Sequence, residues 1–179
     1  PAEAVESFER ALQRAPEAPE IHEQLARARL ALGEQDRALQ ELGAYFQRHP
    51  EADAVARLLG RLRLATGDAA GAEAAIRPVL DRHPDDAVAL EVLGSAALRQ
   101  GRLREGERWL RRVAELEPDS AAARYRHGLA LLALGEADAA LEPLAAAAAG
   151  APDATAPEYA LLLGRLLAGR PAEEIGRAH

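Results

Sequence analysis

Residues 87–120 read AVALEVLGSAALRQGRLREGERWLRRVAELEPDS, and this stretch decides the fold. Its first half places Leu90 and Leu93 at helical spacing, so that one face of a helix is apolar. Gly101 interrupts the pattern, because glycine readily takes the positive φ that ends a helix. A second helical pattern follows and stops at Pro118, which cannot continue a helix. The stretch therefore predicts two short helices joined by a tight turn.

This hairpin is one copy of a repeat with a period of 34 residues. Two series of helix-breaking residues mark the period from one end of the chain to the other. The prolines of the series are Pro16, Pro50, Pro84, Pro118 and Pro152, and the glycines are Gly33, Gly67, Gly101, Gly135 and Gly169. A fixed period of this length indicates stacked helical units. The expected fold class is all-α, built from antiparallel helix hairpins.

The repeat resembles that of the tetratricopeptide repeat (TPR) family. In that family the first helix contains a Leu-Gly pair, present here as Leu59-Gly60 and Leu93-Gly94, with His127-Gly128 as a variant. The second helix contains a small residue at a fixed position, and here those residues are Ala4, Ala38, Ala72, Gly106 and Ala140. Small residues let two helix backbones approach closely. The resemblance implies a right-handed α-α superhelix, the TPR solenoid.

The repeat boundaries predict a single TPR solenoid over residues 1–179. Residues 1–18 match only the second helix of a unit, and residues 155–179 begin a fifth unit that is not completed. The four full units are 19–52, 53–86, 87–120 and 121–154. Because both ends cut through a repeat, we expect the chain to be part of a longer protein. The abundance of Ala and Arg, with no Lys and no Asn, favours a bacterial source.

Charge and composition exclude several classes of partner. The net charge is −7 and no segment is strongly basic, which argues against a nucleic-acid partner. No apolar run reaches the roughly 18 residues of a transmembrane helix, so we expect no direct membrane insertion. The absence of Cys leaves the redox compartment undecided, and either bacterial cytoplasm or periplasm fits.

The residues with catalytic chemistry do not form an enzymatic pattern. No serine lies in a nucleophile-elbow sequence, and no glycine-rich phosphate loop is present. No two histidines have metal-ligand spacing on one helical turn. His49 and His83 share one repeat position, at the end of a second helix, where a basic group favours the negative terminus. We therefore expect no enzymatic activity, no cofactor and no metal.

The family resemblance supplies candidate binding residues. In TPR proteins one face of each first helix lines a concave groove that binds a peptide. Transferred position by position, the candidate groove residues are Glu23, Arg27, Arg57, Arg61, Glu91, Ser95, Leu98, Tyr125, Leu129, Tyr159 and Leu163.

Three of these candidates form a predicted arginine cluster. Arg57 and Arg61 lie one turn apart, and Arg27 is the equivalent of Arg61 one unit earlier. Such a cluster could hold a carboxylate of a ligand with paired hydrogen bonds. The alternative is a solvated face on which these arginines pair with acids of the chain itself, namely Glu20, Glu23 and Glu91.

The candidates near the C-terminal end are apolar and aromatic. Tyr125 and Tyr159 occupy equivalent positions, as do Leu129 and Leu163. Tyrosine combines contact area with a polar tip, which suits peptide binding. The alternative is that a following repeat covers the terminal helix, residues 155–168. Exposed, that helix is a candidate surface for self-association.

The leading functional hypothesis is a scaffold that binds a peptide or a partner protein in the groove. Two alternatives stay open. One is a substrate-docking arm of a larger enzyme, such as a glycosyltransferase. The other is an assembly factor for the cell envelope, exopolysaccharide or secretion.

Several residues depart from the family pattern and give further expectations. Pro78 and Pro143 fall inside second helices and are expected to kink or shorten them. Arg29 stands where the family has a bulky aromatic residue, and its head is expected to reach outward to solvent. His127 takes the position of a leucine and is expected to be buried and hydrogen-bonded.

Overall fold

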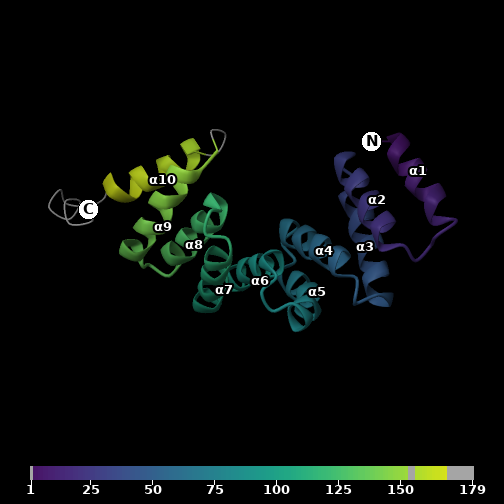
Figure 1. Ribbon diagram of the computed structural model, residues 1–179, viewed down its shortest axis with the longest axis horizontal. Helices are drawn as coiled ribbons and strands as arrows, with labels where there is room; N and C mark the ends of the chain where they lie inside the picture. Colours follow the sequence, from purple (N-terminus) through teal and green to yellow (C-terminus); the bar gives the residue numbers. More distant parts are fainter. Residues whose placement is uncertain (1, 153–155, 169–179) are drawn as a thin grey trace. The chain divides into compact units, whose positions relative to one another are not determined.

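The computed structural model describes residues 2–152 and 156–168, and within these ranges the secondary structure consists of helices without strands. Figure 1 shows the helices in chain order. They are α1 (Ala2–Leu12), α2 (Pro19–Ala31), α3 (Gln35–Arg48), α4 (Asp53–Ala65), α5 (Ala69–Arg82), α6 (Ala87–Arg99), α7 (Leu103–Leu116), α8 (Ala121–Ala133), α9 (Ala137–Gly150) and α10 (Ala156–Ala168). The predicted all-α fold is confirmed. The part of the incomplete fifth unit at residues 169–179 lies outside the described residues.

The glycine series forms the turn within each hairpin. Gly33, Gly67, Gly101 and Gly135 have φ angles of 77°, 87°, 77° and 79°. Glycine adopts this left-handed region without the steric cost that a Cβ atom imposes. Each of these glycines lies between the first and the second helix of its unit, as the sequence predicts.

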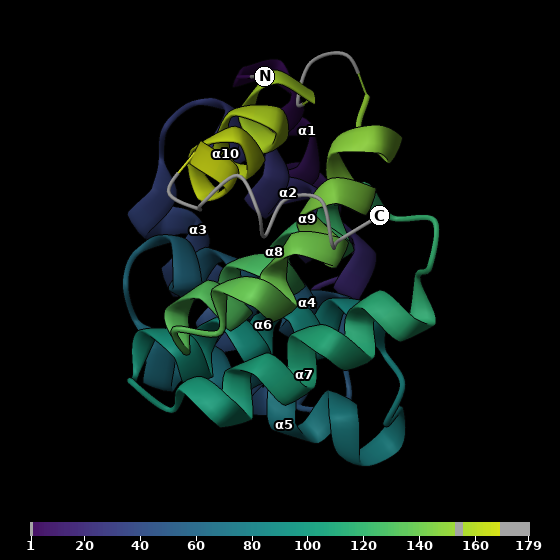
Figure 2. The same ribbon diagram turned by 90° about the vertical axis from the view of Figure 1, so that its left-hand side faces the viewer.

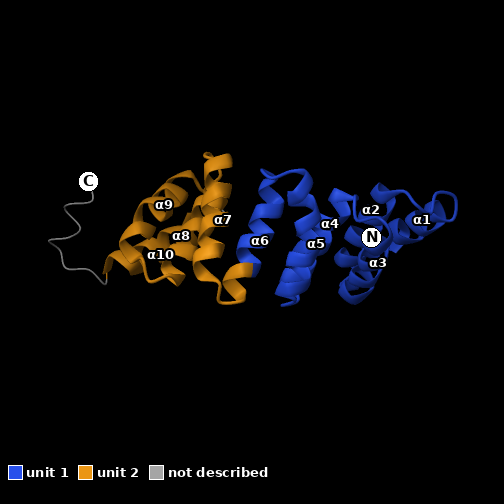
Figure 3. Ribbon diagram, turned by 90° about the horizontal axis from the view of Figure 1, so that it is seen from below, with its two compact units in different colours: residues 1–96 blue, residues 97–179 orange. Residues whose placement is uncertain are grey.

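The chain divides into two compact units, residues 1–96 and residues 97–179, and the division falls near the end of α6 (Figure 3). In the first unit α1 packs on α2, α2 on α3 and α4, and α4 on α3 and α5. In the second unit α7 packs on α8, α8 on α9 and α9 on α10. Figure 2 shows the same helices from a second direction. That residues 1–179 form one continuous domain stays a prediction.

The core of the first unit lies between α2, α3, α4 and α5. Its buried members are Ala26, Ala38, Leu42, Tyr45, Val55, Leu59, Leu62 and Ala75. Gly60 shows why small residues recur on the first helices, because a Cβ atom there would stand 2.8 Å from Cγ1 of Ile76. In the second unit a Cβ atom on Gly128 would stand 2.6 Å from Cγ of Leu144. The Leu-Gly position thus keeps the two helices of a hairpin close together.

The two internal prolines do not shorten their helices. Helices α5 and α9 each contain 14 residues, the same length as α3 and α7. Pro78 and Pro143 deprive the carbonyl groups of Ala74 and Ala139, four residues earlier, of a hydrogen bond. Both alanines are exposed, so water can satisfy those carbonyl groups and the helix continues. The expectation of shortened helices was therefore wrong, while that of kinked helices stays a prediction.

The expectation for Arg29 was also wrong. Its side chain is only 16% exposed and its head lies between α1 and α3. Nη2 donates to Oε1 of Glu9 at 2.9 Å, and Nη1 donates to Glu41. His22 joins the same group, with Nδ1 3.2 Å from Oε1 of Glu41. The guanidinium is turned inward because carboxylates on both neighbouring helices compensate its charge.

His127 agrees in part with its prediction. Its Nε2 lies 3.2 Å from Oε1 of Glu107 on α7, so the ring is hydrogen-bonded as expected. The residue is half-buried rather than buried.

Candidate peptide-binding surface

The first unit presents charged candidates on α2 and α4. On α2, Arg27 donates to Glu23 through Nη2 at 2.6 Å and through Nε at 3.0 Å. The two residues are one helical turn apart, and Arg27 remains exposed. A pair of this kind contributes little to stability, about 0.3–0.5 kcal/mol. This ion pair is one of those that the solvated-face alternative expects.

Arg57 connects two repeats instead of pointing freely into a groove. Its Nε donates to Oδ2 of Asp86 at 2.8 Å, and its Nη2 lies 2.5 Å from the same oxygen. The other oxygen, Oδ1, accepts the backbone N–H of Ala89 at 2.9 Å and so caps the first turn of α6. Asp86 therefore ties α4 to the beginning of α6. The acid that pairs with Arg57 is none of the three that the sequence suggested.

The environment of Asp86 has opposing effects on its pKa. Burial raises the pKa, but the hydrogen bonds from Arg57 and from the Ala89 N–H outweigh burial and bring the pKa below its usual value. The carboxylate is thus held in its charged form. Asp86 is not among the residues singled out from the sequence.

Arg61 is the member of the predicted cluster that stays available. It is exposed, and its guanidinium has no hydrogen-bond or ion-pair partner among residues 2–152 and 156–168. On the next first helix, α6, Glu91, Ser95 and Leu98 are half-buried. The three arginines therefore do not form a free cluster. Arg27 pairs with a glutamate on its own helix, Arg57 is bound to Asp86, and Arg61 is the one of the three without a partner in the described residues.

The second unit brings its two tyrosines together. The rings of Tyr125 on α8 and Tyr159 on α10 are stacked, with centroids 4.0 Å apart and an interplanar angle of 18°. The hydroxyl of Tyr125 donates to Oε1 of Glu158 at 3.2 Å. Burial, followed by this hydrogen bond, raises the pKa of Tyr125. Tyr159 is only 7% exposed, so it supports the partner ring more than it offers a surface.

The two candidate leucines of the second unit differ in their exposure. Leu129 is 38% exposed. Leu163 is half-buried and packs, together with Tyr125, against the buried residues Leu131 and Leu144. The accessible part of this apolar surface is therefore formed by Leu129 and by one side of Tyr125.

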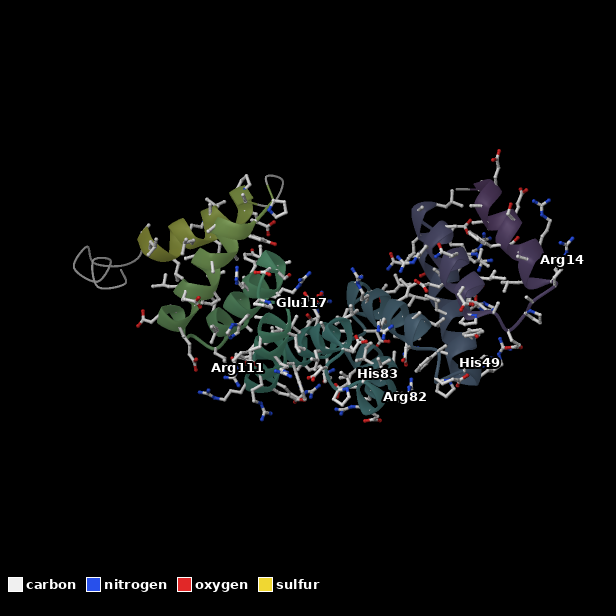
Figure 4. All side chains as sticks on the ribbon, in the orientation of Figure 1. Arg14, His49, Arg82, His83, Arg111 and Glu117 are labelled. Carbon is white, nitrogen blue, oxygen red and sulfur yellow. The ribbon has the colours of Figure 1, made fainter. Side chains whose placement is uncertain are left out.

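A row of basic residues lies at the C-terminal ends of the second helices, and it closes hairpins. Figure 4 shows His49, Arg82 and His83 at the same edge of the first unit. His83 Nε2 lies 2.9 Å from Oδ2 of Asp53, and Arg82 Nη2 lies 2.5 Å from its Oδ1. His49 pairs with Glu17 in the same way at the end of α3. The first helix begins where the second ends, so Asp53 meets Arg82 and His83 within one hairpin, and Glu17, just before α2, meets His49 at the end of α3.

Comparisons with known proteins agree with this geometry. Two family models, both described as Tetratricopeptide repeat, match residues 1–62 and residues 57–116 and 92–157. The chain belongs to the tetratricopeptide repeat family. The TPR fold is that of protein-interaction scaffolds, and the chain has this fold. A search of curated proteins found no match.

Solved TPR structures resemble the chain over most of its length. MamA from residue 41 onward, from Desulfovibrio magneticus RS-1, has a TM-score of 0.75 at 19% identity and covers 83% of this chain and 84% of its own. TTC0263, a thermophilic TPR protein from Thermus thermophilus, has a TM-score of 0.72 at 24% identity, covering 91% and 88%. YrrB, described as a TPR protein with an unusual peptide-binding site, has a TM-score of 0.72 at 20% identity, covering 92% and 84%. At these identities the likeness shows the fold.

The described residues contain neither a membrane-spanning helix nor a metal-binding cluster. No helix within residues 2–152 and 156–168 has the length and apolarity needed to cross a bilayer. Over the same ranges, no three His, Asp or Glu side chains are grouped in a way that could hold a metal ion.

Proposed function

We propose that the first-helix faces of this TPR protein bind an extended segment of a partner protein or peptide. Two exposed residues at groove positions, Arg61 and Leu129, are the observation on which this proposal rests. Arg61 has a guanidinium with no partner in the described chain, and Leu129 is an apolar side chain that a ligand could cover. The fold shared with YrrB, whose description names a peptide-binding site, supports the proposal.

The chemistry of the two faces suggests what each would accept. On α4, Arg61 favours a carboxylate of the ligand, since a charge-assisted hydrogen bond is stronger than a neutral one. On α8, Leu129 and Tyr125 favour an apolar side chain that would lie against the leucine and the tyrosine ring. Arg57 is excluded from a direct role because Asp86 already occupies its guanidinium.

A displayed library of random peptides, selected against the whole chain, would test the proposal. The variants Arg61→Glu and Leu129→Asp are compared with Arg77→Glu and Leu161→Asp. These controls alter an exposed arginine on a second helix and an exposed leucine of α10 that is not a groove candidate. We expect the first pair to weaken binding of selected peptides by about tenfold or more, equivalent to about 1.4 kcal/mol. The control pair should leave binding unchanged.

Equal effects of the test and control variants would reject the first-helix surface as the binding site. The two alternative roles, a docking arm of a larger enzyme and an envelope or secretion assembly factor, stay predictions from the sequence.

A further inference from the structure

A polar pocket lies between α7, α8 and α9 of the second unit, and it uses none of the groove candidates. Arg111, Ala114 and Glu115 line it from α7, Arg124 and His127 from α8, and Glu142 from α9. Figure 4 labels Arg111. The pocket is therefore built mainly between consecutive second helices.

Comparison of the repeats shows what leaves space for this pocket. Ala114 stands where the three preceding units have a bulky apolar residue, namely Leu12, Phe46 and Leu80, while the following unit has Ala148. In the first unit, Phe46 packs against the core. Replacing such a side chain with alanine leaves space at the position that the bulky residue would occupy. The small side chain of Ala114 thus leaves space for the pocket between α7 and its neighbours.

Two basic side chains stand in the wall of the pocket, at positions that are mostly apolar in the other units. His127 stands where the other full units have a buried leucine, namely Leu25, Leu59 and Leu93. Arg124 takes the place of the buried Ala56 and Leu90, and of the buried His22 in unit 19–52. Compared with units 53–86 and 87–120, this junction has therefore lost an apolar filler and gained two polar side chains.

The charges around the pocket are unequally compensated. Arg124 is half-buried, and its guanidinium has no hydrogen-bond or ion-pair partner in the described part of the chain. His127 is held by Glu107 at 3.2 Å. Arg111 makes only long ion pairs, with Nη1 3.9 Å from Oε1 of Glu107 and Nε 3.8 Å from Oε1 of Glu115. One partly desolvated cation thus lacks the counter-charge that such a group normally has.

Glu115 and Glu142 limit the kind of anion that the pocket can accept. Glu115 is compensated by Arg112, with Nη1 3.3 Å from its Oε2. Glu142 is exposed at the rim of the pocket. Its charge would repel a dianion more strongly than a monoanion. A planar carboxylate also matches the paired donors of a guanidinium.

We propose that this pocket binds a carboxylate of a partner protein, with Arg124 as the main donor and Arg111 as a second one. It would be a contact site separate from the first-helix faces. The carboxylate comes from an acidic side chain or from a chain terminus, and the same chemistry serves both.

The test is an NMR titration of the whole chain at constant ionic strength, made up with sodium chloride. The probes are N-acetylglutamate α-amide, which offers a side-chain carboxylate, N-acetylalanine, which offers a terminal one, and inorganic phosphate. We expect saturable shifts of the amide signals of Ala114 and Glu142 with one or both carboxylates, half-complete at about 1–10 mM. The carboxylate that binds more tightly identifies the source.

Two variants and one control make the result decisive. Arg124→Gln removes the donor, and Ala114→Leu refills the pocket with the residue found at Leu80. Each should abolish the saturable shifts while leaving the circular dichroism spectrum unchanged. Arg104→Gln, an exposed arginine on α7, should not alter them. The proposal is overturned by shifts that do not saturate, by shifts that persist in Ala114→Leu, or by phosphate binding as tightly as the carboxylates. Because the titration does not involve Arg61 or Leu129, its failure would leave the first-helix proposal intact.

Discussion

The close contact between Gly60 and Ile76 gives a prediction with a calculable size. In Gly60→Ala the new Cβ atom would stand 2.8 Å from Cγ1 and 3.0 Å from Cδ1 of Ile76, and 3.2 Å from Cγ1 of Val92. Carbon atoms in favourable contact are about 3.5–4.0 Å apart, so the helices or side chains must separate by about 0.7 Å. Ile76 and Val92 are buried and cannot swing into solvent.

The magnitude follows from two opposing effects. Overpacking of a buried site costs about 1–3 kcal/mol. Alanine is favoured over glycine inside a helix by about 0.8–1.0 kcal/mol, which offsets part of that cost. We therefore expect Gly60→Ala to lower the free energy of unfolding by about 1 kcal/mol.

A matched variant separates the two effects. Gly43 also lies within a helix of the first unit, but a Cβ atom there would meet only Nη2 of Arg63, at 3.9 Å. Gly43→Ala should therefore raise the free energy of unfolding by about 0.5–1 kcal/mol. The measurement is urea denaturation followed by circular dichroism, with the midpoint and slope compared among the variants. In an Ile76→Ala background, most of the cost of Gly60→Ala should disappear.

Equal stabilisation by Gly60→Ala and Gly43→Ala would refute the close-packing argument. So would a cost of Gly60→Ala that persists in full when Ile76 is shortened.

Three further outcomes follow from other contacts. Arg57→Ala should lower the free energy of unfolding by about 1.5–3 kcal/mol in urea denaturation, since Asp86 loses a charged donor and stays half-buried; an unchanged midpoint would show that the pair contributes nothing. The hydrogen bond from His49, opposed by a smaller effect of burial, lowers the pKa of Glu17. The Glu17 carboxylate therefore stabilises the fold above about pH 4.5, and this contribution is lost as the pH falls further. Below that pH, the urea midpoint of Glu17→Gln should fall less steeply than that of the unaltered protein. Trp109→Phe should be neutral or stabilising in thermal unfolding, because the buried Nε1 has no hydrogen-bond partner in the described structure; a clear loss of stability would contradict this.

The sequence predicts the backbone of this protein better than its side-chain contacts. The positive φ of the four described series glycines follows from the period alone, because no other residue fits that turn as readily. The small residue at Gly60 also follows, since the repeat pairs it with a large one on the next helix. Both conclusions depend on features that recur in every unit.

Contacts that occur only once could not be predicted in this way. The repeat position of Asp86 is occupied by alanine at Ala52 and by serine at Ser120, so the period gives no reason to pair it with Arg57. The inward turn of Arg29 depends on Glu9 and Glu41 lying on opposite sides of it, which requires the packing of three helices. The length of α5 could not be predicted from Pro78 alone, because Ala74, whose carbonyl group loses its hydrogen bond, is exposed. The positions of candidate groove residues could be predicted from the sequence, but whether their side chains are free to contact a ligand could not.

The bond between Arg57 and Asp86 has a consequence for cooperativity. In a linear array each repeat melts with its neighbours only to the extent that the interface between them is stable. This bond joins unit 53–86 to the beginning of α6 and sits at a position where neighbouring repeats have no acid. Added salt or acid would weaken it and so shorten the stretch of chain that unfolds as one block. Loss of Asp86 would therefore broaden the unfolding transition as well as lower its midpoint.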